Sequence, residues 1–341
     1  MENRYFWWFR RWPSPVKLDL DRLPSDLPAT DVRYFIRIFQ HIERLLPEKG
    51  FTFVLTWHLD TFDEAMKGAV VLLIGDEQHQ IPSYQRHVRA IFKTSGLRPN
   101  PIKETLRLPM PIAWRVLLRD SRNLALCAQR WWRREAPRKI VTPMYEIPLG
   151  YFTLRDIDPM PVEERPLDVF FAGTTAVSGW HGTLRPSAMA RKQMRKALAE
   201  AQSQLPECRV ESVWVSPTGK GLSPEEYTQK LANTKIALAP RGNFDAETSR
   251  LFEAAKLGCV PVSEPLPPRW YFRDCPALIV QRWSELPDLL RGLLKNPARI
   301  QELSRRARAW WDSTISEAAV ARFIAKKVSS LGSLGQGTED S

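Results

Sequence analysis

The pattern of apolar and polar residues changes character near the middle of the chain. In the first half, two short apolar runs at 51–57 and 69–75 are each followed by a polar turn, which is typical of buried parallel strands. The pattern at 111–134 predicts a helix with a basic C-terminal end. Residues 148–166 are rich in proline and have no sustained period, so we interpret them as a linker.

Beyond this linker, apolar runs alternate regularly with stretches of helical period. The apolar runs lie at 168–172, 209–215, 235–240, 260–264 and 277–281, and helices are expected between them at 187–204, 223–233 and 246–257. Such alternation predicts an α/β fold with a parallel sheet that is covered on both faces and binds ligands at the carboxyl ends of its strands. Functional loops are therefore expected after Ala172, Val215, Pro240 and Glu264.

The length of the chain predicts more than one domain. Its 341 residues exceed the roughly 100–200 residues of a typical domain. We expect one domain at 1–160 and a second at 161–315, followed by a helix and a frayed tail at 316–341.

Composition and charge narrow the class of protein. Hydrophobic residues make up 43% of the chain and charged residues 26%, as in a soluble globular protein. No apolar stretch reaches the roughly 18–20 residues that span a bilayer, and no secretory signal pattern is present, so we expect a cytoplasmic protein. The net charge of +12 favours ligands that carry phosphate.

An aromatic and basic cluster opens the chain at residues 5–12. It contains Trp7, Trp8 and Trp12. Such a cluster is suited to lying at a lipid interface or to filling a groove on its own protein. Peripheral contact with the inner membrane surface through these tryptophans is therefore one expectation.

The strongest chemical signal follows the run at 235–240. Pro240, Arg241 and Gly242 stand between an apolar strand and a predicted helix, where the main chain leaves amides unpaired. A helix N-terminus and a neighbouring guanidinium are together suited to a diphosphate.

The helix that follows carries a polar stripe. Glu247, Arg250 and Glu253 are spaced three residues apart, so they share one slowly spiralling face. A carboxylate here would accept the hydroxyls of a ribose. The alternative is an internal salt bridge, between Glu247 and Arg250 or between Arg250 and Glu253.

The whole segment 237–262, ALAPRG-x4-ETSRLFEAAKLGCVPV, resembles the C-terminal signature of the exostosin-like glycosyltransferases, family 47 and its bacterial relatives. The clear match covers roughly 165–285 and is loose at 51–150. The resemblance implies a GT-B architecture, with two Rossmann-like domains facing across a cleft, an acceptor-side domain first and a nucleotide-sugar donor domain second.

The resemblance also implies roles for individual residues. Arg241, with Gly242 in the same loop, would neutralise the diphosphate, and Glu253 would hold the ribose. Glu247 with Arg250 would fix the phosphate loop. Two weaker candidates for the phosphate side are Gly173 and Arg191.

An inverting transfer needs a base for the acceptor hydroxyl. Candidates follow the two N-terminal strands: His58 and Asp60 after the first, and Asp76 and Glu77, which we favour, after the second. Each could instead be a capping or solvated side chain, and Asp76, Glu77 and His79 together could bind a metal adventitiously. Because protein cations and amides can stabilise the leaving group, we expect that no metal or other cofactor is required.

We therefore expect a glycosyltransferase that moves a sugar from a nucleoside diphosphate, with UDP favoured, to a growing glycan or a lipid-linked acceptor. One alternative is a module that binds nucleic acid or an anionic surface, suggested by the charge and by the tryptophan pairs 131–132 and 310–311. No nucleic-acid fold signature accompanies them, so nucleic acid is not expected as a partner. Another alternative is a sugar-nucleotide epimerase or phosphorylase on the same scaffold.

Overall fold

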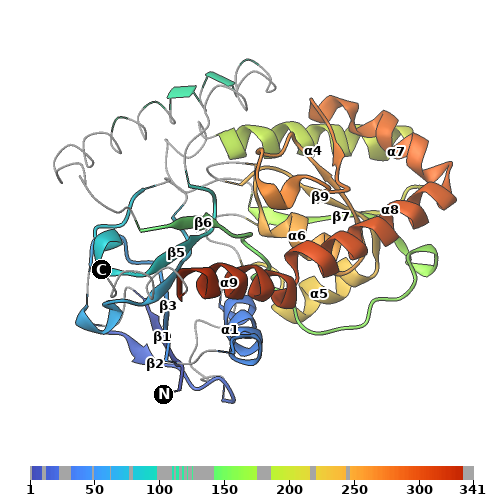
Figure 1. Ribbon diagram of the computed structural model, residues 1–341. Coiled ribbons are helices and arrows are strands. Elements are labelled where there is room, and N and C mark those ends of the chain that lie inside the picture. Colours follow the sequence, from blue (N-terminus) through green and yellow to red (C-terminus); the bar gives the residue numbers. More distant parts are fainter. Residues whose placement is uncertain are drawn as a thin grey trace. The chain divides into compact units, whose positions relative to one another are not determined.

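The protein consists of two compact units, each built on its own sheet (Figure 1). This computed structural model describes residues 2–9, 13–22, 32–47, 50–61, 63–76, 80–97, 142–174, 186–215, 220–242 and 246–332, and single residues between 110 and 125. The first unit comprises Met1–Pro99, Asn123–Leu149 and Ile315–Ser341, and the second comprises Asn100–Arg122 and Gly150–Thr314. The predicted α/β class, with a parallel sheet in each half, is confirmed.

The sheet of the first unit has the strand order β2-β1-β3-β4-β5-β6. Its strands are β1 (Arg4–Trp8), β2 (Val16–Lys17), β3 (Thr52–Thr56), β4 (Val70–Leu73), β5 (Ala90–Lys93) and β6 (Met144–Glu146). Adjacent strands are parallel, except that β2 is antiparallel to β1. The apolar runs predicted at 51–57 and 69–75 thus become β3 and β4, both fully buried.

The two α-helices described in the first unit come from opposite ends of the chain. They are α1 (Arg33–Leu45) and α9 (Glu317–Gly332), and 3-10 turns lie at Glu64–Met66 and Gln85–His87. Helix α1 packs against α9, and Arg37 forms an ion pair of 3.6 Å with Glu317. The C-terminal helix therefore belongs to the unit that contains the N-terminus.

Residues 5–8 of the N-terminal aromatic cluster belong to an interior strand, β1. Both Trp7 and Trp8 on β1 are only 2% exposed, because β1 lies between β2 and β3 and its side chains enter the core. The expectation that these two tryptophans contact a membrane is therefore wrong, since they have no surface to offer to lipid. Trp12 lies outside the described residues.

The sheet of the second unit has the order β11-β10-β9-β7-β8, with all its strands parallel. The strands are β7 (Leu167–Thr174), β8 (Val210–Val215), β9 (Thr234–Ala239), β10 (Val260–Ser263) and β11 (Leu278–Ile279). The helices are α4 (Pro186–Gln204), α5 (Pro224–Ala232), α6 (Ser249–Lys256), α7 (Leu286–Leu294) and α8 (Pro297–Trp310). Short turns lie at Val162–Glu164, Trp270–Phe272 and Trp283–Glu285, and a π-helical turn at Trp311–Ile315. Figure 1 shows α4 and α7 on one face of this sheet and α5, α6 and α8 on the other.

Local chemistry explains where two of these helices begin and end. The hydroxyl of Ser223 accepts from the amide of Glu226, whose carboxylate accepts from the amide of Ser223, a reciprocal cap that starts α5. Gly258 has a φ of 67°, a left-handed conformation that glycine adopts without strain, and it separates α6 from β10.

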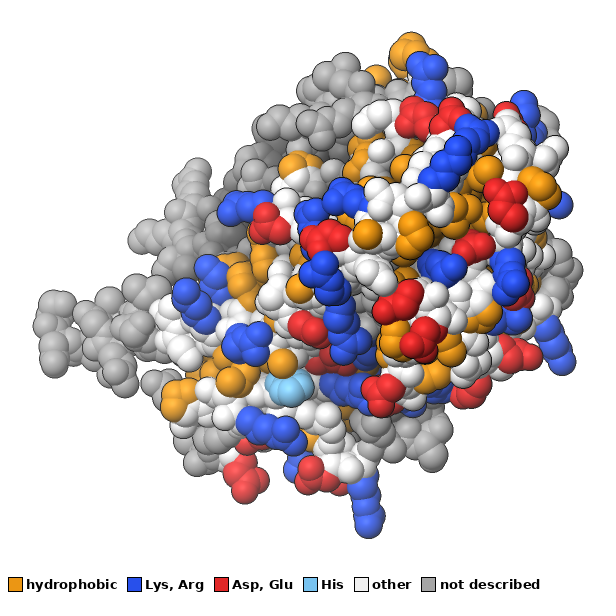
Figure 2. Space-filling view, turned by 90° about the vertical axis from the view of Figure 1, so that its right-hand side faces the viewer, with side chains coloured by type: hydrophobic (Ala, Val, Ile, Leu, Met, Phe, Trp, Pro, Cys, Tyr) orange, Lys and Arg blue, Asp and Glu red, His pale blue; other side chains and the backbone are white. Residues whose placement is uncertain are grey.

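Charged side chains of both signs cover the face drawn in Figure 2, with Lys and Arg interspersed among Asp and Glu. None of the helices in the described part of the chain is long and apolar enough to span a membrane. The tryptophan pair at 310–311 is buried, which favours packing over stacking on bases, and the pair at 131–132 lies outside the described residues.

Candidate functional site

Three neighbouring strands of the second sheet end at one edge. Strands β7, β9 and β10 are adjacent and parallel, so their carboxyl ends at Thr174, Ala239 and Ser263 meet there. Arg241 and Glu264, which follow β9 and β10, are buried and charged. This is the edge at which parallel sheets bind ligands.

A main-chain hydrogen bond holds Arg241 in place, while its guanidinium still has donors that could bind a ligand. Its amide donates to Oε2 of Glu264 at 2.8 Å. The residue is 1% exposed, yet no described residue accepts a hydrogen bond from its Nε or Nη1. A buried guanidinium with unsatisfied donors is costly unless an anionic partner completes it.

Arg191 of α4 joins the same edge. Its Nη1 donates to the carbonyl oxygen of Thr174 at 3.1 Å and to the Thr174 hydroxyl at 2.8 Å, while its buried Nε finds no acceptor among the described residues. Burial and the nearby charge of Arg250 lower the pKa of Arg191 to about 10, although Glu264 opposes this. An anion would relieve the repulsion between these cations.

Glu264 was not among the residues predicted for the site. It directly follows β10 and is buried, and burial raises its pKa against the opposing attraction of Arg241 and Arg191. The sequence did place a functional loop after this position, but only the adjacency of β9 and β10 shows that its carboxylate meets Arg241.

Gly173 gives Arg250 its position. Nε of Arg250 donates to the carbonyl oxygen of Ala172 at 2.7 Å, and its guanidinium lies 5.5 Å from the ring centre of Phe171. A Cβ at Gly173 would lie 2.7 Å from Nη2 of Arg250. The glycine therefore lets this guanidinium lie against the end of β7.

Glu247 forms an internal salt bridge, with a partner that the sequence did not indicate. Its Oε2 accepts from Nη1 of Arg269 and, at 2.9 Å, from the hydroxyl of Tyr271. All three side chains are buried. They fix the main chain just before α6, so a positioning role for Glu247 is compatible with this geometry.

Glu253 is also engaged internally. Its Oε1 accepts from the amides of Phe152 and Thr153 at 3.1 and 3.2 Å, and its Oε2 accepts from the hydroxyl of Tyr227 at 2.8 Å. A carboxylate has about four acceptor positions, so three internal donors leave room for about one more. The ribose role remains a prediction.

Helix α6 begins later than expected. The predicted start at 246 placed free helix amides close to Arg241, whereas the helix begins at Ser249. Gly242 is half-buried and directly follows Arg241, and residues 243–245 lie outside the described residues. Any binding of phosphate by Arg241 therefore depends on its guanidinium and not on the free amides of α6.

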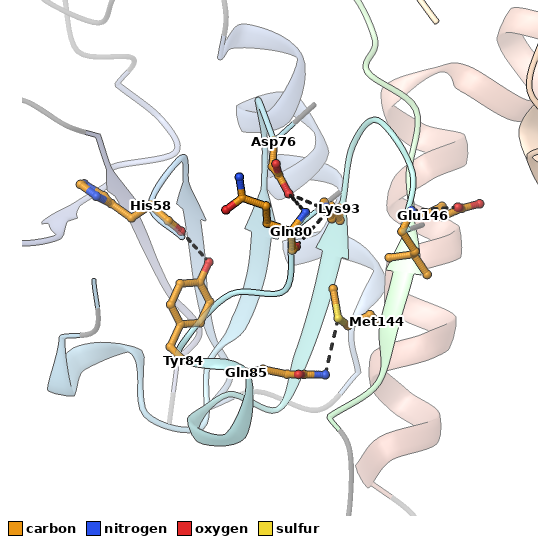
Figure 3. Close-up of polar contacts among 9 residues, drawn as sticks. His58, Asp76, Gln80, Tyr84, Gln85, Lys93, Met144 and Glu146 are labelled. Carbon is orange, nitrogen blue, oxygen red and sulfur yellow. Dashed lines mark hydrogen bonds and ion pairs between the residues drawn. The ribbon is translucent and has the colours of Figure 1, made fainter. Parts of the chain in front are cut away.

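The candidate bases lie in the first unit, where Figure 3 shows Asp76 beside Lys93. Oδ2 of Asp76 is 2.7 Å from Nζ of Lys93 and also accepts from the amide of Gln80 at 2.7 Å. Both side chains of the ion pair are almost fully buried. Asp76 thus neutralises a buried ammonium, and a role as base is an untested prediction.

His58 differs from Asp76 in having a ring nitrogen to spare. Its imidazole lies 4.3 Å from the ring centre of Trp8, and its carbonyl oxygen accepts from the hydroxyl of Tyr84 at 2.9 Å. Its buried Nε2 has no hydrogen-bond partner among the described residues. Figure 3 shows the ring directed away from Asp76. Asp60 is exposed, and Glu77 and His79 lie outside the described residues.

A cavity of about 670 Å³ in the second unit lies at the opposite edge of its sheet. Residues 156–163, Arg165 and the facing residues of α6 and α8 line it. Arg165 donates to the carbonyl oxygens of Thr234 and Leu257, at the amino ends of β9 and β10. The cavity is therefore separate from the edge that holds Arg241.

A comparison with protein families matches the part of the chain that contains this site. Residues 189–325 match the family described as glycosyl transferase-like. No curated protein matches the chain.

Solved structures similar to this chain include three with low sequence identity. The GtfA/B complex is 12% identical with a TM-score of 0.45, over 87% of this chain and 60% of that one. The pneumococcal O-GlcNAc transferase GtfA, in complex with UDP and GlcNAc, is 14% identical with a TM-score of 0.43, over 87% and 60%. Sucrose-phosphate synthase from Thermosynechococcus elongatus is 12% identical with a TM-score of 0.42, over 83% and 89%.

The similarity thus spans 60% of the length of the first two of these proteins. The family match runs from the first turn of α4 to the middle of α9, and it includes the loops that carry Arg241 and Glu264. Residues 189–325 are therefore similar to a glycosyl transferase-like family.

Proposed function

We propose that the protein transfers a sugar from a nucleoside-diphosphate sugar, with UDP favoured, to a glycan or lipid-linked acceptor, in a GT-B arrangement of two Rossmann-like domains. In this proposal the diphosphate binds at the carboxyl edge of the second sheet. Arg241 and Arg191 contact its oxygens, and Arg250 adds positive charge at the end of β7.

The observation that carries the proposal is the pair of buried arginines with unsatisfied donors. Arg241 has two free guanidinium nitrogens and Arg191 one, within the described residues, and Glu264 supplies the negative charge near both. Each phosphorus of a diphosphate carries a pair of oxygens that a guanidinium fork can bind in a bidentate way. The match to the glycosyl transferase-like family supports a sugar nucleotide as the source of that diphosphate.

The proposed transfer inverts the sugar and does not require a metal. The cationic groups would stabilise the leaving diphosphate electrostatically, which is the task a metal performs in other transferases. On the acceptor side, the untested base candidates are His58, Asp60, Asp76 and Glu77.

Thermal unfolding with nucleotides tests the donor site. Saturating UDP at about 100 times its Kd should add about 2.7 kcal/mol of stability. We expect this gain to disappear in Arg241→Met and in Arg191→Met, and to persist in Arg209→Met. Arg209 is exposed and lies at the amino end of β8, away from the proposed site.

Two results would contradict the proposal. One is the absence of a shift with UDP, GDP and TDP, and the other is an equal loss of the shift in all three variants. Incubation with a sugar nucleotide, with and without a glycan acceptor, then separates transfer from epimerisation, because only transfer depends on the acceptor.

A further inference from the structure

A buried carboxylate stands at the edge of the second sheet where we propose that a diphosphate binds. Glu264 directly follows β10 and is 3% exposed. Its Oε2 accepts from the main-chain amide of Arg241 at 2.8 Å. This donor is neutral, so the hydrogen bond does not cancel the charge of the carboxylate.

Two opposing effects act on the proton of Glu264. Burial disfavours the ionised carboxylate and raises its pKa, whereas Arg241 and Arg191 favour the ionised form and lower the pKa. The indole of Trp283, in the turn before α7, acts in the same direction as the two arginines. Burial is the larger effect. The ionised form of Glu264 therefore depends on the positive charge around it.

A diphosphate bound to the same arginines would change this balance. Its charges neutralise the guanidinium groups and repel the carboxylate, and both effects favour the protonated acid. The protonated carboxyl group of Glu264 still accepts from the amide of Arg241 through its carbonyl oxygen, and its hydroxyl can donate to a phosphate oxygen. Protonation thus converts a repulsive contact into an attractive one.

A movement of the carboxylate into solvent fits the structure less well. The hydroxyl of Ser263 donates to the carbonyl oxygen of Ala239 at 3.1 Å, and the carbonyl oxygen of Ser263 accepts from the amide of Val280 at 2.9 Å. The main chain just before Glu264 is therefore held on both sides. A buried acidic group in such a place responds to an added negative charge by becoming neutral, because neutralisation costs less than an unpaired buried charge.

We infer that Glu264 takes up a proton from solvent when the diphosphate of a nucleotide binds, and returns it when the nucleotide leaves. The inference rests on the proposed function, because it requires a diphosphate at this edge of the sheet. The ionised carboxylate balances the buried arginines when no nucleotide is bound. As a neutral acid it no longer competes with the nucleotide for them.

Calorimetric titration of UDP into the full chain tests the inference. The binding enthalpy varies with the ionisation enthalpy of the buffer in proportion to the protons taken up, so the titration is repeated in PIPES, MOPS and imidazole at one pH and ionic strength. We expect uptake of up to about one proton by Glu264. Between the pKa values of Glu264 without and with nucleotide, the affinity should fall about tenfold for each unit by which the pH rises. The range to measure is about pH 5.5 to about pH 8.5.

The variant Glu264→Gln isolates this proton from that of the ligand. The terminal phosphate of UDP itself titrates at about pH 6, but this contribution is common to both proteins. We expect Glu264→Gln to bind UDP and to take up fewer protons than the wild type, by up to about one. The control is Asp168→Asn, which removes a buried carboxylate that pairs with Lys235 at the amino end of β7 and should leave the uptake unchanged.

A second measurement needs no variant. The infrared difference spectrum of the wild type with and without UDP should show a band of a protonated carboxyl group when UDP is bound, and its absence would overturn the inference. Equal proton uptake by the wild type and Glu264→Gln would also overturn it, while the proposed donor site would stand. Failure of the wild type to bind UDP would contradict both.

Discussion

The main-chain amide of Arg241 donates a 2.8 Å hydrogen bond to the buried carboxylate of Glu264, which places a negative charge inside a cluster of arginines. This carboxylate competes with any phosphate for the same cations. We expect Glu264→Gln to bind UDP more tightly. The substitution removes a negative charge that repels the phosphates, while the side-chain amide oxygen of Gln can still accept from the main-chain amide of Arg241. Calorimetric titration measures the affinity, and weaker binding would show that Glu264 instead organises the site.

The pH dependence of stability gives a second test of Glu264. Burial raises its pKa above the ordinary carboxyl value. A group whose pKa is raised on folding contributes stability that is complete below the unfolded pKa and is lost as the pH rises through the folded pKa. The free energy of unfolding of the wild type, minus that of Glu264→Gln, should therefore fall as the pH rises from the unfolded pKa to the folded pKa of Glu264. Above the folded pKa this difference should be constant. Urea unfolding between about pH 4 and about pH 8 measures this difference, and an increase with pH would contradict the expectation.

Substitution of Gly173 by alanine can be tested against the same substitution at Gly292 as a control. A Cβ at Gly173 would meet Nη2 of Arg250 at 2.7 Å and the ring of Phe171 at 2.8 Å, whereas one at Gly292 in α7 meets nothing within 4 Å. We expect Gly173→Ala to displace Arg250, weaken UDP binding and lower stability by about 1 kcal/mol. Gly292→Ala should raise stability by about 0.5–1 kcal/mol through helix propensity and leave binding unchanged. Unchanged UDP binding in Gly173→Ala would mean that the position of Arg250 is unimportant for the nucleotide.

The three hydrogen bonds of Glu253 predict a graded loss of stability. In Glu253→Gln, the amide oxygen can still accept from Phe152 and Thr153 while the amide nitrogen donates to Tyr227, so we expect a loss of about 1 kcal/mol. Glu253→Ala leaves all three donors unpaired, and we expect about 3 kcal/mol. Chemical denaturation measures both values. The UDP-induced thermal shift should persist in Glu253→Gln if the carboxylate acts as an internal clamp, and its loss there would favour the ribose role.

Substitutions of the ion pair between Asp76 and Lys93 can distinguish a catalytic role of Asp76 from a purely stabilising one. Asp76→Asn leaves a buried ammonium without its counter-charge, so we expect a destabilisation of about 3–5 kcal/mol, of which the double variant Asp76→Asn/Lys93→Met should recover part. Lys93→Met breaks the same ion pair but keeps the carboxylate. If Asp76 is the base, turnover is lost in Asp76→Asn and retained in Lys93→Met. Equal turnover in the two single variants would leave His58 as the next base candidate.

Local features of the sequence predicted most elements of the second unit. The apolar runs at 168–172, 209–215, 235–240 and 260–264 became β7 to β10, and each prediction depended only on neighbouring residues. A helix start such as that at Ser223 is local for the same reason, because its cap bonds close within four residues.

The same local pattern misled at the N-terminus. Aromatic and basic residues at 5–12 have the composition of an interfacial segment, but β3 lies about fifty residues later in the sequence and pairs with β1, which buries Trp7 and Trp8. Burial here depends on strand order, and periodicity within the segment does not carry that information.

The sequence by itself therefore determined the α/β class and most elements of the second unit, and it predicted Arg241 as a candidate site residue. Only the tertiary structure decided the partners of the charged residues. The adjacency of β9 and β10 brings Glu264 to Arg241, and the packing of α4 brings Arg191 to the end of β7. Helical spacing fixes which residues share a face, but the strand order and the crossovers decide which distant side chains that face meets.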